Sequence, residues 1–381
     1  FADLHDEITA WRRDIHENPE LLFDVHRTAG VVAAKLKEFG CDEVVEGIGR
    51  TGVVGIIKGN KPGDRTIGLR ADMDALPMTE ATGAEHASKT PGKMHACGHD
   101  GHTAMLLGAA KYLAETRNFA GRVAVIFQPA EEGGGGGKEM VDDGMMDRWG
   151  IDEVYGMHNM PGIPAGEFSI RSGPAMAAAD QFEIDINGKG GHAAMPHKAV
   201  DTTVVAAHIV AALQTIASRN LDPVETLVVS VCFFQTETEA YNVIPDSVKM
   251  KGTVRTYKAE VQDMAEARIK EIASGVATAF GATASVNYMR GYPATVNHAD
   301  QTEKAAAVAA RIVGDDRVER NAPPLMGAED FSYMLNARPG AFIFIGNGDT
   351  ASVHHPEYDF NDEIIPTGCS YWAKLVEELM P

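Results

Sequence analysis

Residues 94–102 read MHACGHDGH and contain three histidines, a cysteine and an aspartate. If this segment is extended, its spacing of two residues places His95, Cys97 and His99 on one face. A thiolate and an imidazole on one face can ligate a metal ion, and Cys97 could also act as a nucleophile with a histidine distant in sequence. A structural zinc site needs a second Cys/His pair at short spacing, which the sequence lacks. One segment supplies only part of a ligand set, so the other ligands must come from elsewhere in the chain.

The adjacent acids Glu131 and Glu132 follow a short apolar run at 122–127. Neighbouring side chains of an extended chain point in opposite directions, so one carboxylate can ligate a metal while the other acts as a general base. Paired acids in a loop are more often solvated surface groups. Here the apolar run before them and the glycines at 133–137 after them favour a site. Those glycines do not match a phosphate-binding loop and predict a turn that lets the backbone pass close to the site.

Two further histidines follow apolar runs that predict strands. His158 closes the run EVYGMH, and His354 comes after AFIFIGNGDTASV. Mixed sulfur, nitrogen and oxygen ligands suit zinc, cobalt, nickel or manganese. Five ligands are too many for one tetrahedral ion, so the pattern predicts a hydrolytic site with two divalent ions and a water between them. The predicted ligands are Cys97, His99, Glu132, His158 and His354.

The elements that must position these residues alternate between helical and strand-like patterns. An amphipathic helix opens the chain, and the first half has helical spacing at 28–39 and 103–115 and strand patterns at 53–57, 66–69 and 122–127. This alternation predicts an α/β fold with a mainly parallel sheet, whose ligands collect beyond the carboxyl ends of the strands.

Two domains are predicted, because 381 residues exceed one ordinary core. From residue 180 the pattern changes to β-α-β-β-α-β, which is typical of a small sandwich of antiparallel sheet and two helices. After residue 293 the α/β pattern returns, with a helix near 300–313, the strand AFIFIG and a final helix near 366–379. We therefore expect residues 1–179 and 294–381 to form the larger domain and residues 180–293 to be inserted into it.

The charge balance excludes two classes of partner. The chain has 34 lysines and arginines against 54 aspartates and glutamates, a formal net charge of −20. Such a field repels phosphate backbones and anionic lipids, so neither nucleic acid nor a membrane is an expected partner. An anionic substrate would need a local positive group.

The cysteines and the apolar runs predict the compartment. Cys41, Cys97, Cys232 and Cys369 are scattered, without a C-x-x-C motif, which fits a reducing compartment and disfavours a disulfide. No run approaches the roughly 20 apolar residues of a membrane span, and the first residues do not resemble a signal peptide. A cytoplasmic protein is the expectation.

Eight motifs, in order along nearly the whole chain, resemble the M20 metallopeptidase family. They are GLRADMDALPM (68–78), MHACGHDGHTAMLLGAA (94–110), FQPAEEGGGG (127–136), GMHNMPGIPAGEF (156–168), GKGGHAAMPH (188–197), NVIPDSVKMKGTVRT (242–256), MGAEDFSYM (326–334) and VHHPEYDFND (353–362). Within the family, the chain is most similar to the N-acyl-amino-acid amidohydrolases, a branch that includes hippurate hydrolases and plant auxin-conjugate hydrolases.

The resemblance implies a role for each matched residue. The five predicted ligands match the metal ligands of the branch, and Glu131 matches the general base that moves a proton from the bridging water to the leaving nitrogen. His192 matches a histidine that reaches the active site of the other subunit of a homodimer and stabilises the oxyanion. Asn242 and Arg255 match a pair that holds the substrate's α-carboxylate, for which arginine offers a bidentate fork. The inserted domain is then a lid and dimerisation domain.

Some positions depart from the family pattern or lie beside it. Many relatives have a histidine ligand two residues before an aspartate, where this chain reads Asp72-Met73-Asp74, so the two aspartates are expected to support the ligands. The run CFFQTETEAY before Asn242 is bulkier and more polar than is common in the branch. The histidines beside matched positions are expected to orient ligands more often than to bind metal: His95, His102, His197 and His355.

The resulting hypothesis is an enzyme that uses two divalent ions (Zn, Mn, Co or Ni) to cleave the amide bond of small N-acyl-L-amino acids. A dipeptidase or carboxypeptidase with the same residues is the alternative within hydrolases. A binding protein without activity, and an enzyme that uses Cys97 as its nucleophile, are alternatives of other classes. The sequence leaves the acyl group open between acetyl, benzoyl, indole-acetyl and longer chains.

Overall fold

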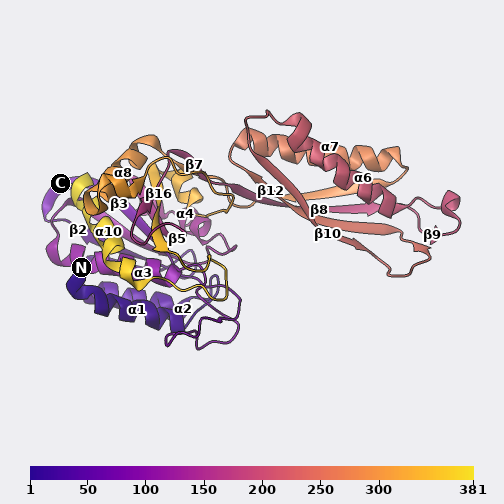
Figure 1. Ribbon diagram of the computed structural model, residues 1–381. Coiled ribbons are helices and arrows are strands. Elements are labelled where there is room, and N and C mark those ends of the chain that lie inside the picture. The colour runs from indigo at the N-terminus through magenta and orange to yellow at the C-terminus, as the bar shows by residue number, and fades with distance from the viewer. The chain divides into compact units, whose positions relative to one another are not determined.

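A computed structural model describes residues 1–381 and divides the chain into two compact units (Figure 1). Unit 1 comprises Phe1–Ala175, Thr295–Pro324 and Asp330–Pro381, and unit 2 comprises Met176–Ala294 and Leu325–Glu329. Unit 2 is therefore an insertion into unit 1. The short segment Leu325–Glu329 clusters with unit 2, although the sequence pattern assigned it to the larger domain.

Unit 1 is built on an eight-stranded sheet in the order β1-β2-β4-β3-β5-β16-β6-β15. The pairings of β4 with β3, β3 with β5, and β5 with β16 are parallel, whereas β1, β2 and β4 pair antiparallel. Its central strands are buried over most of their length and mainly apolar, because both faces are covered. The predicted mixed α/β class is confirmed. The strands are β1 Glu43–Ile48, β2 Gly52–Lys58, β3 Lys61–Asp72, β4 Ala120–Gln128, β5 Glu153–Pro161, β6 Phe168–Ser169, β15 Val318–Glu319 and β16 Gly340–Gly348.

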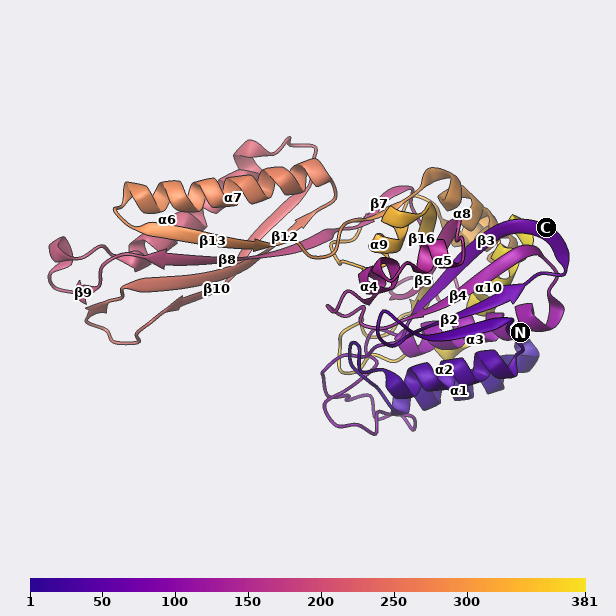
Figure 2. The same cartoon turned by 180° about the vertical axis from the view of Figure 1, so that it is seen from behind.

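Helices cover both faces of this sheet. On one face, α8 contacts α10, α10 contacts α3, and α3 contacts α1 and α2, which gives the row seen in Figure 1. The shorter α4, α5 and α9 are seen from behind in Figure 2, where α4 contacts both α5 and α9. The helices are α1 His5–Glu17, α2 His26–Glu38, α3 His99–Thr116, α4 Gly136–Asp142, α5 Met145–Arg148, α8 Ala299–Val313, α9 Ser332–Ala337 and α10 Ile365–Leu379. None of the helices in the structure has the length and apolar character needed to span a bilayer.

Unit 2 consists of a four-stranded antiparallel sheet in the order β10-β12-β8-β13, with α6 and α7 side by side on one face (Figures 1 and 2). Its own apolar cluster lies between the sheet and these helices. Asp201 caps α6 by accepting the N–H groups of Thr203 and Val204 at 3.0 and 3.3 Å. The elements are β8 Ala178–Asn187, β9 Gly191–His192, α6 Thr202–Thr215, β10 Leu227–Thr236, β11 Val243–Ile244, β12 Ser247–Thr256, α7 Ala259–Ala279 and β13 Thr283–Met289.

The insertion leaves and rejoins unit 1 through two paired strands. The strand β7, Gly173–Met176, forms a two-stranded sheet with β14, Thr295–Asn297. The Asn297 side chain fixes this junction to the large sheet, since its Nδ2 donates to the Phe342 carbonyl and its Oδ1 accepts the Phe342 N–H. The two ends of the inserted segment are thus held next to each other.

Candidate metal centre

Cys97 and His99 meet through a bend and a helix start, which differs from the extended segment predicted from their spacing. Gly98, in the left-handed region at φ 89°, stands between them, and α3 begins at His99. The Nδ1 of the fully buried His99 lies 2.7 Å from the Asp74 carbonyl, which accepts its proton. Nε2 is therefore the ring atom left for a metal ion, and this buried atom has no hydrogen-bond partner. Burial favours the neutral ring, but the nearby charge of Asp72 outweighs it and raises the pKa of His99, so a metal ion would displace the second proton.

His158 lies within β5 and does not end it. The strand continues to Pro161 because its pairing with β16 runs past this point, with His158 opposite Phe344. The imidazole Nδ1 donates to the Asn159 carbonyl at 2.6 Å, and Nε2 lies 3.4 Å from Cys97 Sγ. Burial and the neighbouring His102 lower the pKa of His158, so its ring is neutral and can offer Nε2 to a metal.

Asp74 fixes the pair of glutamates. Its carboxylate accepts the N–H of Glu131 at 2.9 Å and that of Glu132 at 3.1 Å. The preceding residue, Ala130, has a left-handed backbone at φ 54°, and its N–H donates to the Leu22 carbonyl at 3.1 Å. This loop is held by hydrogen bonds on both sides, so the two carboxylates have fixed starting points.

His354 also has a left-handed backbone, at φ 64°, and its N–H donates to the Ala96 carbonyl at 2.7 Å. Its Nε2 lies 3.3 Å from Glu132 Oε1. Hydrogen bonds to Cys97 and Glu132 raise the pKa of this half-exposed imidazole to about 10. Such backbone strain at a non-glycine residue is typical of functional positions.

Cys97 is a thiol rather than a thiolate when no cation is bound. Burial and the nearby charge of Glu132 raise the pKa of its Sγ. A nucleophilic cysteine needs the opposite shift, whereas a ligating thiol releases its proton to solvent or a base when it binds a metal ion. The environment thus disfavours the nucleophile alternative.

Three groups of side chains contain two or more of the predicted ligands, and the donor atoms of each group all lie within 4.8 Å of one another. They are Cys97 with His99 and His158, Cys97 with Glu132 and His354, and His99 with Glu131 and Glu132. The structure therefore brings together all five predicted ligands and Glu131, and Cys97 belongs to two groups. The buried His99 Nε2, which has no hydrogen-bond partner, and the mixed set of sulfur, nitrogen and oxygen donors fit divalent ions of the zinc type.

His102 supports this site without joining the ligands. Its Nδ1 donates to Asp72 Oδ1 at 2.6 Å, and its Nε2 accepts the Asn159 N–H at 2.9 Å. Both ring nitrogens are occupied, in agreement with an orienting role. Asp72 is in turn paired with the buried Arg70 at 2.8 Å.

The other histidines beside the motifs stand apart from the three donor groups. His95 is buried, and neither ring nitrogen has a hydrogen-bond partner. His355 is exposed and accepts the Glu357 N–H through Nδ1 at 3.1 Å. His197 is an exposed residue of unit 2.

Sequence reasoning missed a buried charge network next to the centre. His16 on α1 pairs with Asp100 on α3, Nδ1 to Oδ2 at 2.8 Å, and both side chains are fully buried. Arg12 lies 3.5 Å from the same carboxylate and also pairs with Asp362 at 2.7 Å. The sequence signals this network only by polar residues on the inner face of the first helix. It does not indicate their partner, because Asp100 is more than 80 positions from His16.

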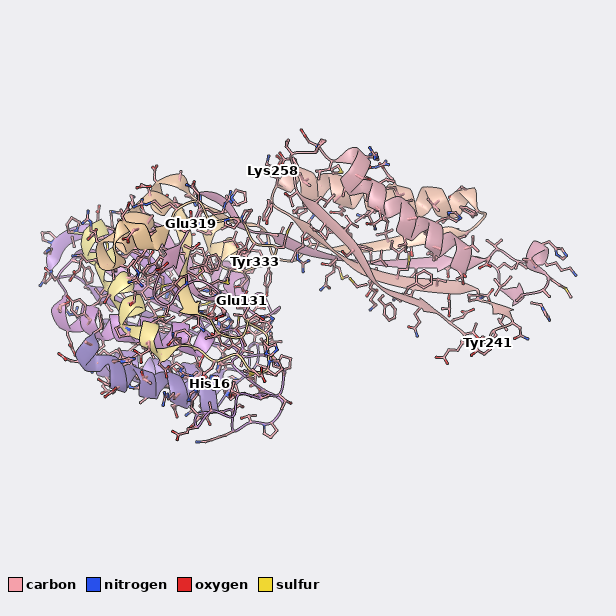
Figure 3. All side chains as sticks on the ribbon, in the orientation of Figure 1. His16, Glu131, Tyr241, Lys258, Glu319 and Tyr333 are labelled. Carbon is pink, nitrogen blue, oxygen red and sulfur yellow. The ribbon has the colours of Figure 1, made fainter.

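The remaining predicted site residues lie in unit 2. His192 and Asn242 are neighbours, because β9 pairs with β11, His192 lies opposite Val243, and the Ala193 N–H donates to the Asn242 carbonyl. Arg255 is at the other end of this unit. It lies eight residues from Ser247 on β12, about 27 Å at about 3.4 Å per residue. Figure 3 shows this separation through Tyr241 and Lys258, which flank the two positions in sequence. One chain does not bring Asn242 and Arg255 together.

A mixed α/β unit with clustered thiol, imidazole and carboxylate donors, and an inserted α+β unit, indicates a metal-dependent hydrolase. Residues 68–378 match the family described as Peptidase family M20/M25/M40, and the chain belongs to that family. It is 44% identical over 376 residues to a hippurate hydrolase of Campylobacter jejuni, with 98% of this chain and 97% of the relative covered. It is 42% identical over 383 residues to thermostable carboxypeptidase 2 of Saccharolobus solfataricus, at 98% and 95% coverage.

A solved structure supports the same assignment. It is a Bacillus subtilis protein described as a dinuclear metal binding peptidase from the M20 family, with a TM-score of 0.87, 34% identity, and 100% of this chain and 99% of that chain covered. The predicted family and amidohydrolase branch are confirmed, and the chain is a hydrolytic enzyme of the amidohydrolase type.

Proposed function

We propose that this enzyme uses two divalent ions to hydrolyse the amide bond of N-acyl-L-amino acids. The observation that carries the proposal is the position of Cys97, whose Sγ belongs to one donor group with His99 and His158 and to another with Glu132 and His354. Two adjacent ions could share this thiolate. When bound, they would polarise the scissile carbonyl and lower the pKa of a water molecule.

Glu131 is the proposed general base. Its backbone is anchored by Asp74, and its carboxylate lies in one donor group with His99 and Glu132. It is 8% exposed, which keeps bulk water away from the proton it moves. In this assignment Glu131 takes a proton from the attacking water and gives it to the leaving nitrogen.

Arg255 is proposed to bind the substrate's α-carboxylate, and His192 and Asn242 are proposed to act together in the partner subunit's site. This arrangement is supported by the separation of Asn242 from Arg255 within one chain. A homodimer is further supported by the edge strand β10, where Phe233 and Phe234 are 40% and 43% exposed. Large exposed aromatic side chains on an open edge favour contact with another chain.

The trans assignment can be tested by mixing two inactive variants, Glu131→Gln and His192→Ala. Equal mixing gives half heterodimers, each with one intact site, so activity should return to about a quarter of the wild-type value. Two inactive variants that stay inactive after subunit exchange, or a fully active monomer by mass, would contradict the assignment.

Between N-acyl-amino acids and peptides, we favour N-acyl-amino acids as substrates, because two of the similar proteins are named for hydrolysis of such compounds. One similar protein is described as a hippurate hydrolase and another as an N-acetylcysteine deacetylase. The similar thermostable carboxypeptidase keeps peptides as the second candidate. Rates on N-acetyl, N-benzoyl and dipeptide substrates at equal concentration separate the two.

The central experiment is this substrate panel before and after exhaustive chelation, with Zn²⁺, Mn²⁺, Co²⁺ and Ni²⁺ added back separately. Activity should vanish on chelation and return with metal. Glu131→Gln should bind metal normally and lose at least 10²-fold in kcat, while Glu115→Gln, an exposed glutamate on α3, should match wild type. Activity that survives chelation would instead support Cys97 as a nucleophile, and tight substrate binding without turnover would support a binding protein.

The cytoplasm is the proposed compartment. All four cysteines are free, and Cys97 must stay reduced to ligate a metal. Mild oxidant should abolish metal binding in wild type, and fractionation of cells should place the protein with other cytoplasmic enzymes.

A further inference from the structure

One buried amide connects three segments that carry proposed ligands. Asn159 directly follows His158 on β5 and is fully buried. Its Nδ2 donates to the Cys97 carbonyl at 2.7 Å. Its Oδ1 accepts the hydroxyl proton of Tyr358 at 2.7 Å, and Tyr358 is in the same loop as His354. A shift of this amide would therefore move Cys97, His158 and His354 relative to one another.

The orientation of the amide is determined by its neighbours. His102 gives its Nδ1 proton to Asp72, so its Nε2 is an acceptor that faces Asn159 Nδ2 at 3.0 Å. The opposite orientation would place Asn159 Oδ1 against two acceptors, His102 Nε2 and the Cys97 carbonyl. Only one of the two amide orientations satisfies every group.

Gly98 leaves the space that these contacts need. A Cβ at this position would lie 2.2 Å from Asn159 Nδ2 and 2.5 Å from the Tyr358 hydroxyl oxygen. Its φ of 89° also favours glycine. Tyr358 is fully buried, and its N–H donates to the His355 carbonyl at 3.0 Å. The amide, the phenol and the glycine backbone are thus packed in direct contact next to Cys97.

We propose that Asn159, together with Tyr358, is a positioning residue that sets the spacing of Cys97, His158 and His354 and thereby the affinity of the site for metal. The inference rests on the proposed ligand set. In this role Asn159 and Tyr358 neither contact the substrate nor transfer a proton. Its consequence is that removing the hydroxyl group of Tyr358, which is not itself a proposed ligand, weakens ligation by the Cys97 thiolate.

The test uses Co²⁺, whose bond to a thiolate gives a charge-transfer band in the near ultraviolet. Tyr358→Phe removes only the hydroxyl that orients Asn159, and Asn159→Asp removes the donor to the Cys97 carbonyl. Both variants should bind Co²⁺ 10–100-fold more weakly than wild type in competition with a chelator, as expected for an orienting partner of a ligand. The band should be shifted or weakened at saturating Co²⁺.

Tyr155→Phe is the matched control. Tyr155 is, like Tyr358, a fully buried tyrosine, and its hydroxyl donates at 2.8 Å to Glu153, the first residue of β5 and five positions before His158. This variant should keep the wild-type affinity and band. Tyr358→Phe keeps the ring that fills the core, so it remains informative if Asn159→Asp does not fold.

The outcomes separate the inference from the proposed function. Wild-type affinity and band in Tyr358→Phe, or equal losses in Tyr358→Phe and Tyr155→Phe, would overturn the positioning role and leave the ligand set intact. Absence of a thiolate band in wild-type protein would overturn the ligand set itself.

Discussion

The pair of His16 and Asp100 predicts how the stability of unit 1 depends on pH. Burial disfavours the charged imidazole, but the charge of Asp100 and the hydrogen bonds that the ring donates to Asp100 and Glu80 outweigh it and raise the pKa of His16 from 6.5 to about 9. The Nδ1–Oδ2 distance is 2.8 Å, and both side chains are fully buried, so solvent does not screen the pair. His16 is therefore protonated in the folded enzyme at neutral pH.

The magnitude follows from linkage between proton binding and folding. The pKa rises from 6.5 to about 9, and each pH unit is worth about 1.4 kcal/mol, so the contacts of His16 with Asp100 and Glu80 contribute about 3–4 kcal/mol. Because the folded form binds the proton more tightly, this contribution is fully present below pH 6.5. It is lost as the pH rises from 6.5 through 9.

The assay is guanidinium unfolding of chelated wild type and His16→Gln at steps from pH 6 to 10. All three tryptophans, at positions 11, 149 and 372, lie in unit 1, so their fluorescence reports this unit alone. The difference in unfolding free energy between the two proteins should shrink by about 3–4 kcal/mol across this window. A difference that stays constant from pH 6 to 10 would refute a charged His16 in the folded state.

Two further substitutions test the groups that hold the glutamates and Asp72. Arg70→Met should lower the unfolding free energy by about 3–5 kcal/mol in chemical denaturation, because it leaves the buried Asp72 and Asp330 without their cation; a loss below 1 kcal/mol would contradict this. Asp74→Ala should cost about 1–3 kcal/mol for each lost N–H acceptor and should weaken Zn²⁺ binding measured by calorimetry, and an unchanged Zn²⁺ affinity would show that Asp74 does not position Glu132.

The sequence predicted the elements that have strong apolar periodicity and the places of the candidate ligands that follow them. Glu131 and Glu132 lie beyond β4 as expected, because a buried strand leads directly to them. The first part of β3 was missed, because the polar run at 61–65 carries no apolar signal. In this run Lys61 pairs with Ala120 of β4, and the regular pairing with β4 resumes at Thr66. A polar strand of this kind is defined by its neighbours in the sheet, and a local sequence pattern does not contain that information.

Within the site, residue types could be predicted but contacts could not. Cys97 and His99 could be predicted as candidate ligands from their side-chain chemistry. The bend at Gly98 that brings them together could not, because it depends on a packed contact with Asn159 and Tyr358. Such contacts join residues 60 to 260 positions apart in the chain. Similarly, Asn242 and Arg255 share a sequence motif, yet an extended strand of ten residues separates them in space.

The inserted unit also determines the order in which the enzyme can be assembled on the ribosome. The strand β5 ends at Pro161, and its parallel neighbour β16 ends at Gly348. One edge of β5 therefore lacks its partner until the ribosome has synthesised β16. At about 5–20 residues per second this takes roughly 10–40 s. Residues 176–294 emerge during that interval and can pack α6 and α7 on their sheet. The sheet that carries the proposed ligands closes last, so His354 joins the other donor side chains only near the end of synthesis.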